Sequence, residues 1–296
     1  MRRSNTSTTQ LAGVDNVATP HTKRDGRTVP IAWRNIDNAG PAGSINSSVS
    51  EMAQWVRMLL ASGELDGRRI LAASTVRELQ TPHTIAGPGA DTIFPMTHFS
   101  MYGLGLGLRD YHGRKLVSHT GGIDGMLSNV ALVPEERLGV VVLTNTDGQS
   151  AGTVLVHHIL DALLGAPERD WNGLFLRLDA EGRERAARAQ HAADSARVRG
   201  TAPRLPLERY AGTYENELYG SAEVTLDGGS LTLRRFATFS APLEHWHYDT
   251  FRATWSDAAL GRSMITFALD AAGQVESLEI AGIGEFRRVP SEAGKQ

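Results

Sequence analysis

The sequence predicts an α+β fold, with helices flanking an antiparallel sheet, followed by an all-β unit built as a small barrel. Two observations predict the first part: an amphipathic segment at 48–63, and short strands joined by tight turns over 102–146. The second part is predicted by some eight short strands within about 85 residues near the C-terminus. We therefore predict domains at 1–166 and 205–290, joined by a linker helix at 167–204.

The first part begins with a polar stretch and then turns helical. Residues 1–40 are rich in Asn, Thr, Gly and Pro, which predicts an extended loop. Ser48 and Glu51 have the spacing of a capping box, and Gly63 ends the helix that follows them. The apolar residues of that helix share one face: Met52, Trp55, Val56, Leu59 and Leu60. A second, shorter helix is predicted after Ser74 as its N-cap.

The hydrophobic period changes at Tyr102. The segments "YGLGLGLRD", "RKLVSHT", "LSNVALVP" and "LGVVVLTNTD" are separated by turn sequences and predict adjacent antiparallel strands. A helix is predicted at 151–164, ending at Gly165 and Pro167. The arginine- and alanine-rich residues 168–203 lack an apolar stripe, so we expect a solvated connecting helix there.

Composition excludes several classes of function. Hydrophobic residues make up 41% of the chain and charged residues 21%, the balance of a globular protein. The net charge of −3 and the scattered arginines argue against a nucleic-acid partner. The absence of cysteine excludes disulfides and thiolate catalysis, and we expect no cofactor and no metal. The longest apolar runs, such as 138–143, are too short to span a bilayer. No signal peptide opens the chain, and the sequence assigns no localisation.

The stretch "VSHTGGIDGML" (117–127) places an imidazole, a hydroxyl and two glycines where a strand approaches its turn. Glycine lets a backbone amide come close to a ligand. An amide that can stabilise an oxyanion, beside side chains that orient substrate or move a proton, is typical of an acyl-transfer site. Taken alone, the same residues also fit an ordinary turn with a satisfied histidine.

The surrounding segments narrow this choice. "PAGSINSSVSEMAQWVRMLLASGELDGRRIL", "YGLGLGL" and "HTGGIDGMLSNVALVPEERLGVVVLTN" closely resemble serine hydrolases of the class C β-lactamase and D-alanyl-D-alanine carboxypeptidase type, over about 16–164. The resemblance implies that His119, Thr120 and Gly121 replace the Lys-Thr-Gly triad of that family. It further implies catalytic roles for His119, near the nucleophile, and for Gly122, whose N–H joins the oxyanion hole. Thr120 and Gly121 would bind the substrate.

Residues 205–290 resemble, more loosely, the small lipocalin-like β-barrel that many of these hydrolases carry at the C-terminus. The segments "LERYAGTYE" and "FRRV" carry this resemblance. The aromatic residues of this part could fill the barrel core or line a pocket, and we expect the core: Tyr210, Tyr214, Phe236, Trp246, Tyr248, Phe251 and Trp255. The pair His245 and His247 could begin a metal site, but no third ligand is near in sequence.

The sequence departs from the family in its catalytic motifs. The family acylates the serine of a Ser-x-x-Lys motif, and none of the three lysines here follows a serine at that spacing. A Tyr-x-Asn occurs at 214–216, but it lies after the Lys-Thr-Gly equivalent, whereas the family has it before. Ser44-Ile45-Asn46 is interpreted as a loop with local hydrogen bonds. We therefore expect the chain to be the C-terminal portion of a longer hydrolase and to be inactive alone.

Truncation would leave one sheet edge open. The run that contains Val140, Val141 and Val142 would lack its neighbouring strand, and we expect self-association through it. The first functional hypothesis is a serine hydrolase acting on a small-molecule or peptide acyl substrate (an ester, amide or β-lactam). The alternative is a non-catalytic protein that binds a ligand or peptide. Hydrolysis driven by His119 alone is the weakest hypothesis, because its one nearby carboxylate, Asp124, lies in the turn.

Overall fold

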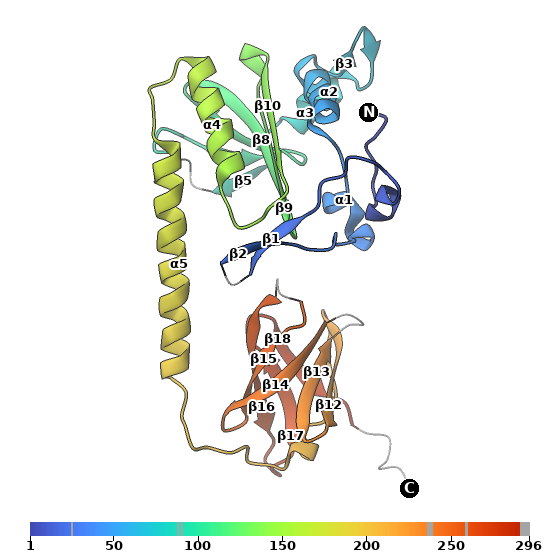
Figure 1. Cartoon of the computed structure of the whole chain (residues 1–296), viewed down its shortest axis with the longest axis vertical. Helices are drawn as coiled ribbons and strands as arrows, with labels where there is room; N and C mark the ends of the chain where they lie inside the picture. Colours follow the sequence, from blue (N-terminus) through green and yellow to red (C-terminus); the bar gives the residue numbers. More distant parts are fainter. Residues whose placement is uncertain (25, 88, 90, 236–238, 258–259, 291–296) are drawn as a thin grey trace. The chain divides into compact units, whose positions relative to one another are not determined.

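The computed structural model describes residues 1–24, 26–87, 89, 91–235, 239–257 and 260–290 (Figure 1). The chain divides into two compact units, Met1–Arg183 and Glu184–Gln296. The first contains helices and an antiparallel sheet, and the second contains a closed barrel. The predicted α+β class, with a small all-β barrel after the sheet, is thereby confirmed.

The sheet of the first unit has six antiparallel strands in the order β10-β9-β8-β7-β6-β5. Their bounds are β5 (Thr84–Gly87), β6 (Ser100–Tyr102), β7 (Gly107–Tyr111), β8 (Arg114–Ile123), β9 (Met126–Val133) and β10 (Leu138–Thr144). The last three match the predicted strands closely. The segment "YGLGLGL" is not one strand, because β6 ends at Tyr102 and the chain turns before β7. A Cβ at Gly103 would lie 2.3 Å from the Leu79 carbonyl oxygen, so this bend requires glycine.

Helices cover both faces of the sheet (Figure 1). Successive strand residues alternate between the two sides: Leu116 belongs to the core beneath α4 (Ala151–Leu164), and Val117 to the core beneath α2 (Val49–Leu60) and α3 (Ala73–Leu79). The first core contains Tyr111, Leu116, Ala131, Val133, Val140, Val154, Leu160 and Trp171. The second contains Val56, Leu59, Val76, Leu108, Val117 and Leu132.

One predicted helix start is wrong, and a second is confirmed only in part. The short helix begins at Ala73 with Ala72 as its N-cap, so Ser74 lies inside the helix. At α2, the Ser48 hydroxyl accepts from the Glu51 N–H at 3.4 Å, but the Glu51 carboxylate accepts from the Arg3 N–H instead of returning to Ser48. Hydrogen bonds from Ser4 and Arg3 lower the pKa of Glu51 to about 2. Only the Ser48 half of the capping box is therefore formed, and the Glu51 carboxylate instead binds Arg3 and Ser4 near the N-terminus.

The first 40 residues are also more ordered than predicted. They form a hairpin of β1 (His21–Arg24) and β2 (Arg27–Pro30), beside the short helices η1 (Thr8–Leu11), η2 (Asp37–Ala39) and α1 (Gly40–Gly43). The His21 N–H donates to the Gly125 carbonyl at 3.2 Å, and the Thr22 hydroxyl donates to Asp147 at 2.8 Å. Asp147 also accepts from the Gly125 N–H at 2.9 Å. This hairpin is thus fixed to the turn between β8 and β9. The two-stranded β3 (Glu64–Leu65) and β4 (Arg68–Arg69) complete the unit.

The second unit is a closed eight-stranded barrel in sequence order, with β11 and β18 pairing to close it. Its strands are β11 (Gly212–Asn216), β12 (Gly220–Asp227), β13 (Ser230–Arg235), β14 (Phe239–His247), β15 (Thr250–Thr254), β16 (Arg262–Leu269), β17 (Val275–Ile280) and β18 (Gly284–Arg288). Four predicted core aromatics are buried inside: Tyr210, Tyr214, Phe251 and Trp255. Tyr248 is instead 51% exposed, and Phe236 lies outside the described residues.

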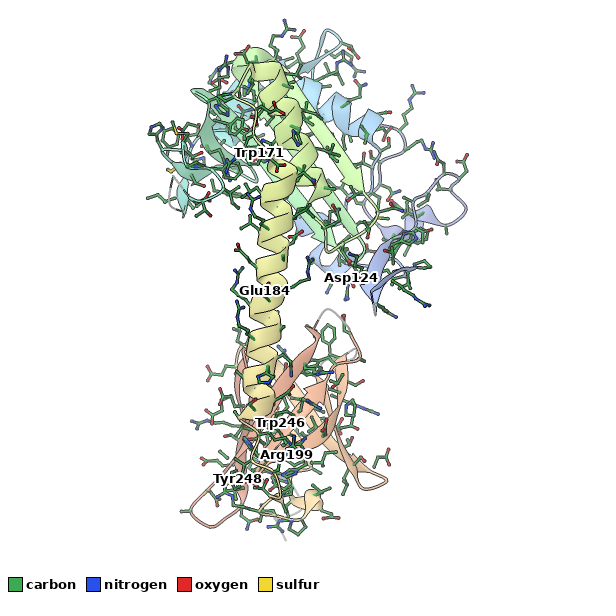
Figure 2. All side chains as sticks on the ribbon, turned by 60° about the vertical axis from the view of Figure 1, so that its left-hand side comes forward. Asp124, Trp171, Glu184, Arg199, Trp246 and Tyr248 are labelled. Carbon is green, nitrogen blue, oxygen red and sulfur yellow. The ribbon has the colours of Figure 1, made fainter. Side chains whose placement is uncertain are left out.

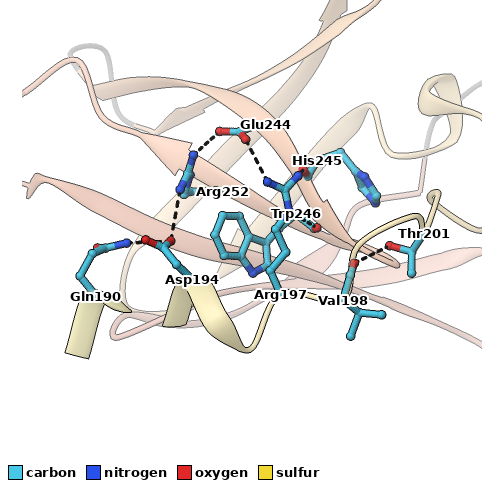
Figure 3. Close-up of polar contacts among 9 residues, drawn as sticks. All are labelled: Gln190, Asp194, Arg197, Val198, Thr201, Glu244, His245, Trp246 and Arg252. Carbon is cyan, nitrogen blue, oxygen red and sulfur yellow. Dashed lines mark hydrogen bonds and ion pairs between the residues drawn. The ribbon is translucent and has the colours of Figure 1, made fainter. Parts of the chain in front are cut away.

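The helix α5 (Trp171–Ser195) begins in the first unit, where Trp171 is buried (Figure 2), and ends in the second. Its last turn is held to the barrel around Trp246, which lies outside the barrel core. The guanidinium groups of Arg197 and Arg252 lie 4.7 and 4.6 Å from the Trp246 ring (Figure 3). Arg252 also forms an ion pair with Asp194 at 3.7 Å. The end of the connecting helix is therefore anchored to the barrel, while most of its surface is exposed as predicted.

Candidate active site

The strand β8 changes its surroundings halfway along. From Arg114 to Ser118 it pairs with β7, and from Val117 onward it pairs with β9. From His119 to Ile123 it pairs with β9 alone, because β7 begins at Gly107, opposite Ser118. Among the described strands, none covers this second half on the β7 side. The segment 119–122 therefore lies along an open edge, and all four of its residues are exposed.

The direction of the backbone groups on this edge follows from the two hairpin turns. Residues that flank a two-residue turn face each other across the ladder, and successive residues then alternate between the two edges of the strand. Arg114 flanks the turn to β7, and Ile123 flanks the turn to β9. Both turns give the same alternation, in which Thr120 and Gly122 direct their N–H and C=O groups away from β9. The Gly122 N–H thus points to the open edge.

His119 contacts an aromatic residue from another strand. The Tyr102 hydroxyl, at the end of β6, lies 2.9 Å from the His119 Nε2 atom. The two ring centroids are 6.1 Å apart in an edge-on arrangement. Tyr102 pairs with Gly107 of β7, and Gly107 pairs with Ser118, so β7 lies between the two rings' strands. Sequence reasoning missed Tyr102. The signal available was the tyrosine that opens "YGLGLGL", in a segment already recognised for its resemblance.

Thr120 and Gly121 are positioned by their partners on β9. Thr120 pairs with Asn129, whose side chain accepts a hydrogen bond from the Thr153 hydroxyl of α4 at 3.2 Å. Gly121 pairs with Ser128, and a Cβ at Gly121 would lie 2.5 Å from the Ser128 hydroxyl oxygen. A larger residue at 121 would therefore displace the serine side chain. Glycine is therefore the residue that fits at position 121 without moving Ser128.

The turn after the strand binds the N-terminal residues. Asp124 accepts hydrogen bonds from the Arg34 guanidinium, at 2.8 Å to its Nε atom, and forms an ion pair with it. This carboxylate is therefore engaged by Arg34, which removes it as the partner that the His119-only hypothesis needed. Gly125 has φ +74°, and a Cβ there would lie 2.7 Å from Pro20. Glycine is thus required where the turn meets the hairpin.

The other candidates from the sequence lie elsewhere and have structural roles. Tyr214 of the misplaced Tyr-x-Asn is fully buried in the barrel and donates to the Tyr210 carbonyl at 2.7 Å. Asn46 donates to the Ser44 carbonyl at 3.2 Å, as predicted for that loop. A register shift in β14 separates His245, which contacts the Tyr248 carbonyl, from His247, which accepts from the Val198 N–H.

No cluster of three or more metal-ligating side chains occurs among the described residues. The described part of the chain likewise includes no helix long and apolar enough to cross a membrane.

Two family matches divide the chain. Residues 2–164 match the family described as Beta-lactamase, and residues 196–291 match a domain of unknown function (DUF3471). Among curated proteins, the chain is 30% identical over 288 residues to the Unguisins hydrolase ungD of Aspergillus violaceofuscus, covering 88% of this chain and 49% of that protein. The Unguisins hydrolase ungD' of Aspergillus campestris is 28% identical, over 67% of this chain and 37% of that protein.

Among solved structures, the octameric penicillin-binding protein homologue from Pyrococcus abyssi matches with 19% identity and a TM-score of 0.47, over 97% of this chain and 56% of that chain. The present chain spans 49% and 37% of the lengths of the two curated relatives named above.

Proposed function

The chain belongs to the beta-lactamase family, and from that membership we propose that it supplies one wall of a serine-hydrolase acyl-transfer site. The wall is the open half of β8, His119 to Gly122. Within the proposal, residues 1–166 are the hydrolase part, 167–204 the connecting segment and 205–290 the accessory barrel. The substrate class is an ester, amide or β-lactam, in a small molecule or a peptide.

The observation that carries this proposal is the direction of the backbone at Gly122. Its N–H faces an edge with no described strand beside it, where a substrate's carbonyl oxygen could approach. A backbone N–H in that position stabilises the negative charge that develops on the oxygen during acyl transfer. The backbone of Thr120 faces the same open edge, and Thr120 also offers a hydroxyl to the substrate. Gly121 adds no side chain between Thr120 and Gly122. His119 supplies a hydrogen-bonding imidazole beside them.

The nucleophile is not part of this wall. No Ser-x-x-Lys occurs in the sequence, and its one Tyr-x-Asn is in the barrel core. Oxyanion stabilisation and substrate contacts do not by themselves form the covalent acyl intermediate on which the family's chemistry depends. We therefore propose that the 296-residue chain is inactive by itself, and that the serine, lysine and tyrosine come from sequence outside it. The curated relatives are named unguisins hydrolases, so an unguisin is one candidate substrate.

Covalent labelling tests this proposal. The purified chain is expected not to react with a fluorophosphonate or a penicillin, because it offers no activated serine. The genomic sequence upstream of Met1, read in frame, is expected to encode Ser-x-x-Lys followed by Tyr-x-Asn. A protein extended through those motifs is expected to be labelled, and the same protein with the motif serine changed to alanine provides the control.

Stoichiometric labelling of the 296-residue chain would contradict the proposal. An upstream region without the two motifs, together with saturable binding of a ligand or peptide that is not turned over, would favour the non-catalytic alternative. Mass spectrometry of the intact chain after labelling shows directly whether a covalent adduct has formed.

We further propose that the chain self-associates through β10. Among the described strands, β10 pairs with β9 alone, and helices α2 and α4 cover its two faces. The alternation set by the β8–β9 turn directs the backbone of Val140 and Val142 toward β9, and that of Val141 outward. An edge with free N–H and C=O groups between apolar side chains is a template for pairing with another copy.

Substituting Val141 by proline is expected to reduce this association. Proline removes the outward N–H without removing a bond to β9, and prolines are tolerated on edge strands. Sedimentation velocity over a concentration series measures the effect, with Val141→Ala as the control that shortens the side chain and keeps the N–H. A wild-type chain that stays monomeric throughout the series would refute the edge proposal, as would equal association of the proline and alanine variants.

A further inference from the structure

The pair formed by Tyr102 and His119 has a direction that decides what His119 can do. A neutral imidazole has one nitrogen that donates and one that accepts, and a phenol can do either. The 2.9 Å contact at Nε2 is therefore formed in one of two ways. In the first, the Tyr102 hydroxyl donates to a bare Nε2, and the ring proton is on Nδ1. In the second, Nε2 carries the proton and donates to the phenol oxygen.

The chemistry of the two groups favours the first arrangement. A phenol O–H is a more acidic donor than the N–H of a neutral imidazole, and a bare imidazole nitrogen is a stronger acceptor than a phenol oxygen. Among the described residues, the His119 ring has no second hydrogen-bond partner. No group among them donates to Nδ1, so none of them favours a deprotonated Nδ1. The Tyr102 hydroxyl likewise has no other acceptor among the described residues.

We propose that Tyr102 is a positioning residue that holds the proton of neutral His119 on Nδ1, so that the imidazole presents a hydrogen-bond donor to the substrate. This inference rests on the proposed function for the nature of the partner, which is then an acceptor: a carbonyl or carboxylate oxygen of the acyl compound. His119 would thus add a second donor to that of the Gly122 N–H, three residues away on the same strand. It would not act as a general base at that nitrogen.

The tautomer is measurable in the chain as it exists, without any catalytic turnover. Long-range proton–nitrogen correlation NMR on the ¹⁵N-labelled protein, at a mildly alkaline pH where histidine is neutral, distinguishes a protonated ring nitrogen from a bare one. The resonance of His119 is assigned by its loss in His119→Gln. The expected result is a protonated Nδ1 and a bare Nε2 in the wild-type chain.

Two variants separate Tyr102 from general effects on the fold. In Tyr102→Phe the hydroxyl is absent, and the His119 ring is expected to become a mixture of both tautomers. Tyr248→Phe removes the hydroxyl of a tyrosine that is 51% exposed in the other unit, and it should leave the His119 spectrum unchanged. This pair of variants is matched in chemistry and differs only in location.

A proton on Nε2 in the wild-type chain would overturn the inference even if Tyr102→Phe does not fold. An unchanged His119 spectrum in a folded Tyr102→Phe variant would overturn it equally. Neither result depends on acylation, so failure here is distinguishable from failure of the proposed hydrolase function. The extended protein can be labelled even if the His119 proton is on Nε2. Conversely, the proton can be on Nδ1 even if no protein is labelled.

Discussion

Substituting Asp161 by alanine is expected to lower the free energy of unfolding of the first unit by about 2–5 kcal/mol. Asp161, in α4, is only 7% exposed. One carboxylate oxygen accepts from the Tyr111 hydroxyl of β7, and the other accepts from the Trp171 indole N–H of α5 at 2.6 Å. Alanine would leave both buried donors without a partner, and each would keep its desolvation cost.

The Asp161 carboxylate connects α4, β7 and α5 through hydrogen bonds. Burial and the hydrogen bond to Asp161 raise the pKa of Tyr111 above its ordinary value, so the phenol remains a donor. The buried His157 ring lies against the Trp171 ring, with the centroids 4.6 Å apart and the planes tilted by 36°, and burial lowers the pKa of this imidazole. The uncharged His157 therefore packs as an aromatic side chain beside the acid, and the carboxylate carries the polar connections between the elements.

Amide hydrogen exchange in β8 and β9 of the intact chain measures the effect, because it reports the opening of that unit separately. Asp161→Asn retains one acceptor oxygen and is expected to lose less stability than alanine. Asp15→Ala, at a side chain that is 97% exposed, is expected to stay within about 0.5 kcal/mol of the wild type. Equal stability of the Asp161→Ala and Asp15→Ala variants would show that the carboxylate does not connect these elements.

Substituting Phe267 by alanine is expected to cost the barrel about 3–5 kcal/mol. Phe267, in β16, is 2% exposed. Its ring centroid lies 5.0 Å from Tyr210, 5.9 Å from Tyr214 and 5.7 Å from Phe251, each in an edge-on arrangement. Edge-on aromatic pairs add stability beyond the area they bury. The alanine variant would lose all three contacts and leave a cavity at the centre of the barrel.

Exchange of the amides in β12 and β17 measures the stability of the barrel. Leu218→Ala, at a leucine that is 79% exposed, serves as the control and is expected to be near neutral. Phe267→Leu refills part of the cavity, so its stability is expected to lie between those of the Phe267→Ala and Leu218→Ala variants. A barrel that tolerates the alanine variant as well as the leucine variant would mean that its interior collapses around the lost ring, contrary to the close packing described here.

The sequence predicted the elements whose cause is local. The strands β8, β9 and β10 were recognisable because their turns and their alternating residues lie within the same short segments. Helix α4 was predicted with its observed bounds, since Gly165 and Pro167 end its apolar pattern. The family resemblance of this part is confirmed by the match over residues 2–164. In these elements, the residues that set the structure are neighbours along the chain.

Contacts between distant segments could not be predicted in this way. The hairpin at His21 depends on Gly125 and Asp147, so nothing in its own polar sequence indicates a strand. Tyr102 is 17 residues from His119, and their contact depends on the path of β6 and β7. Likewise, the separation of His245 from His247 comes from a register shift against β15, which alternation alone does not reveal. The roles proposed for His119 to Gly122 remain predictions.

The hydrogen bond from Thr22 to Asp147 has a consequence for biosynthesis. The two residues are 125 positions apart, so at about 5–20 residues per second the ribosome needs roughly 6–25 seconds to make the second after the first. During that interval the nascent hairpin lacks the residue that its Thr22 side chain binds in the folded unit. The last contacts around the turn that follows His119 can form only after the downstream segment has emerged from the exit tunnel.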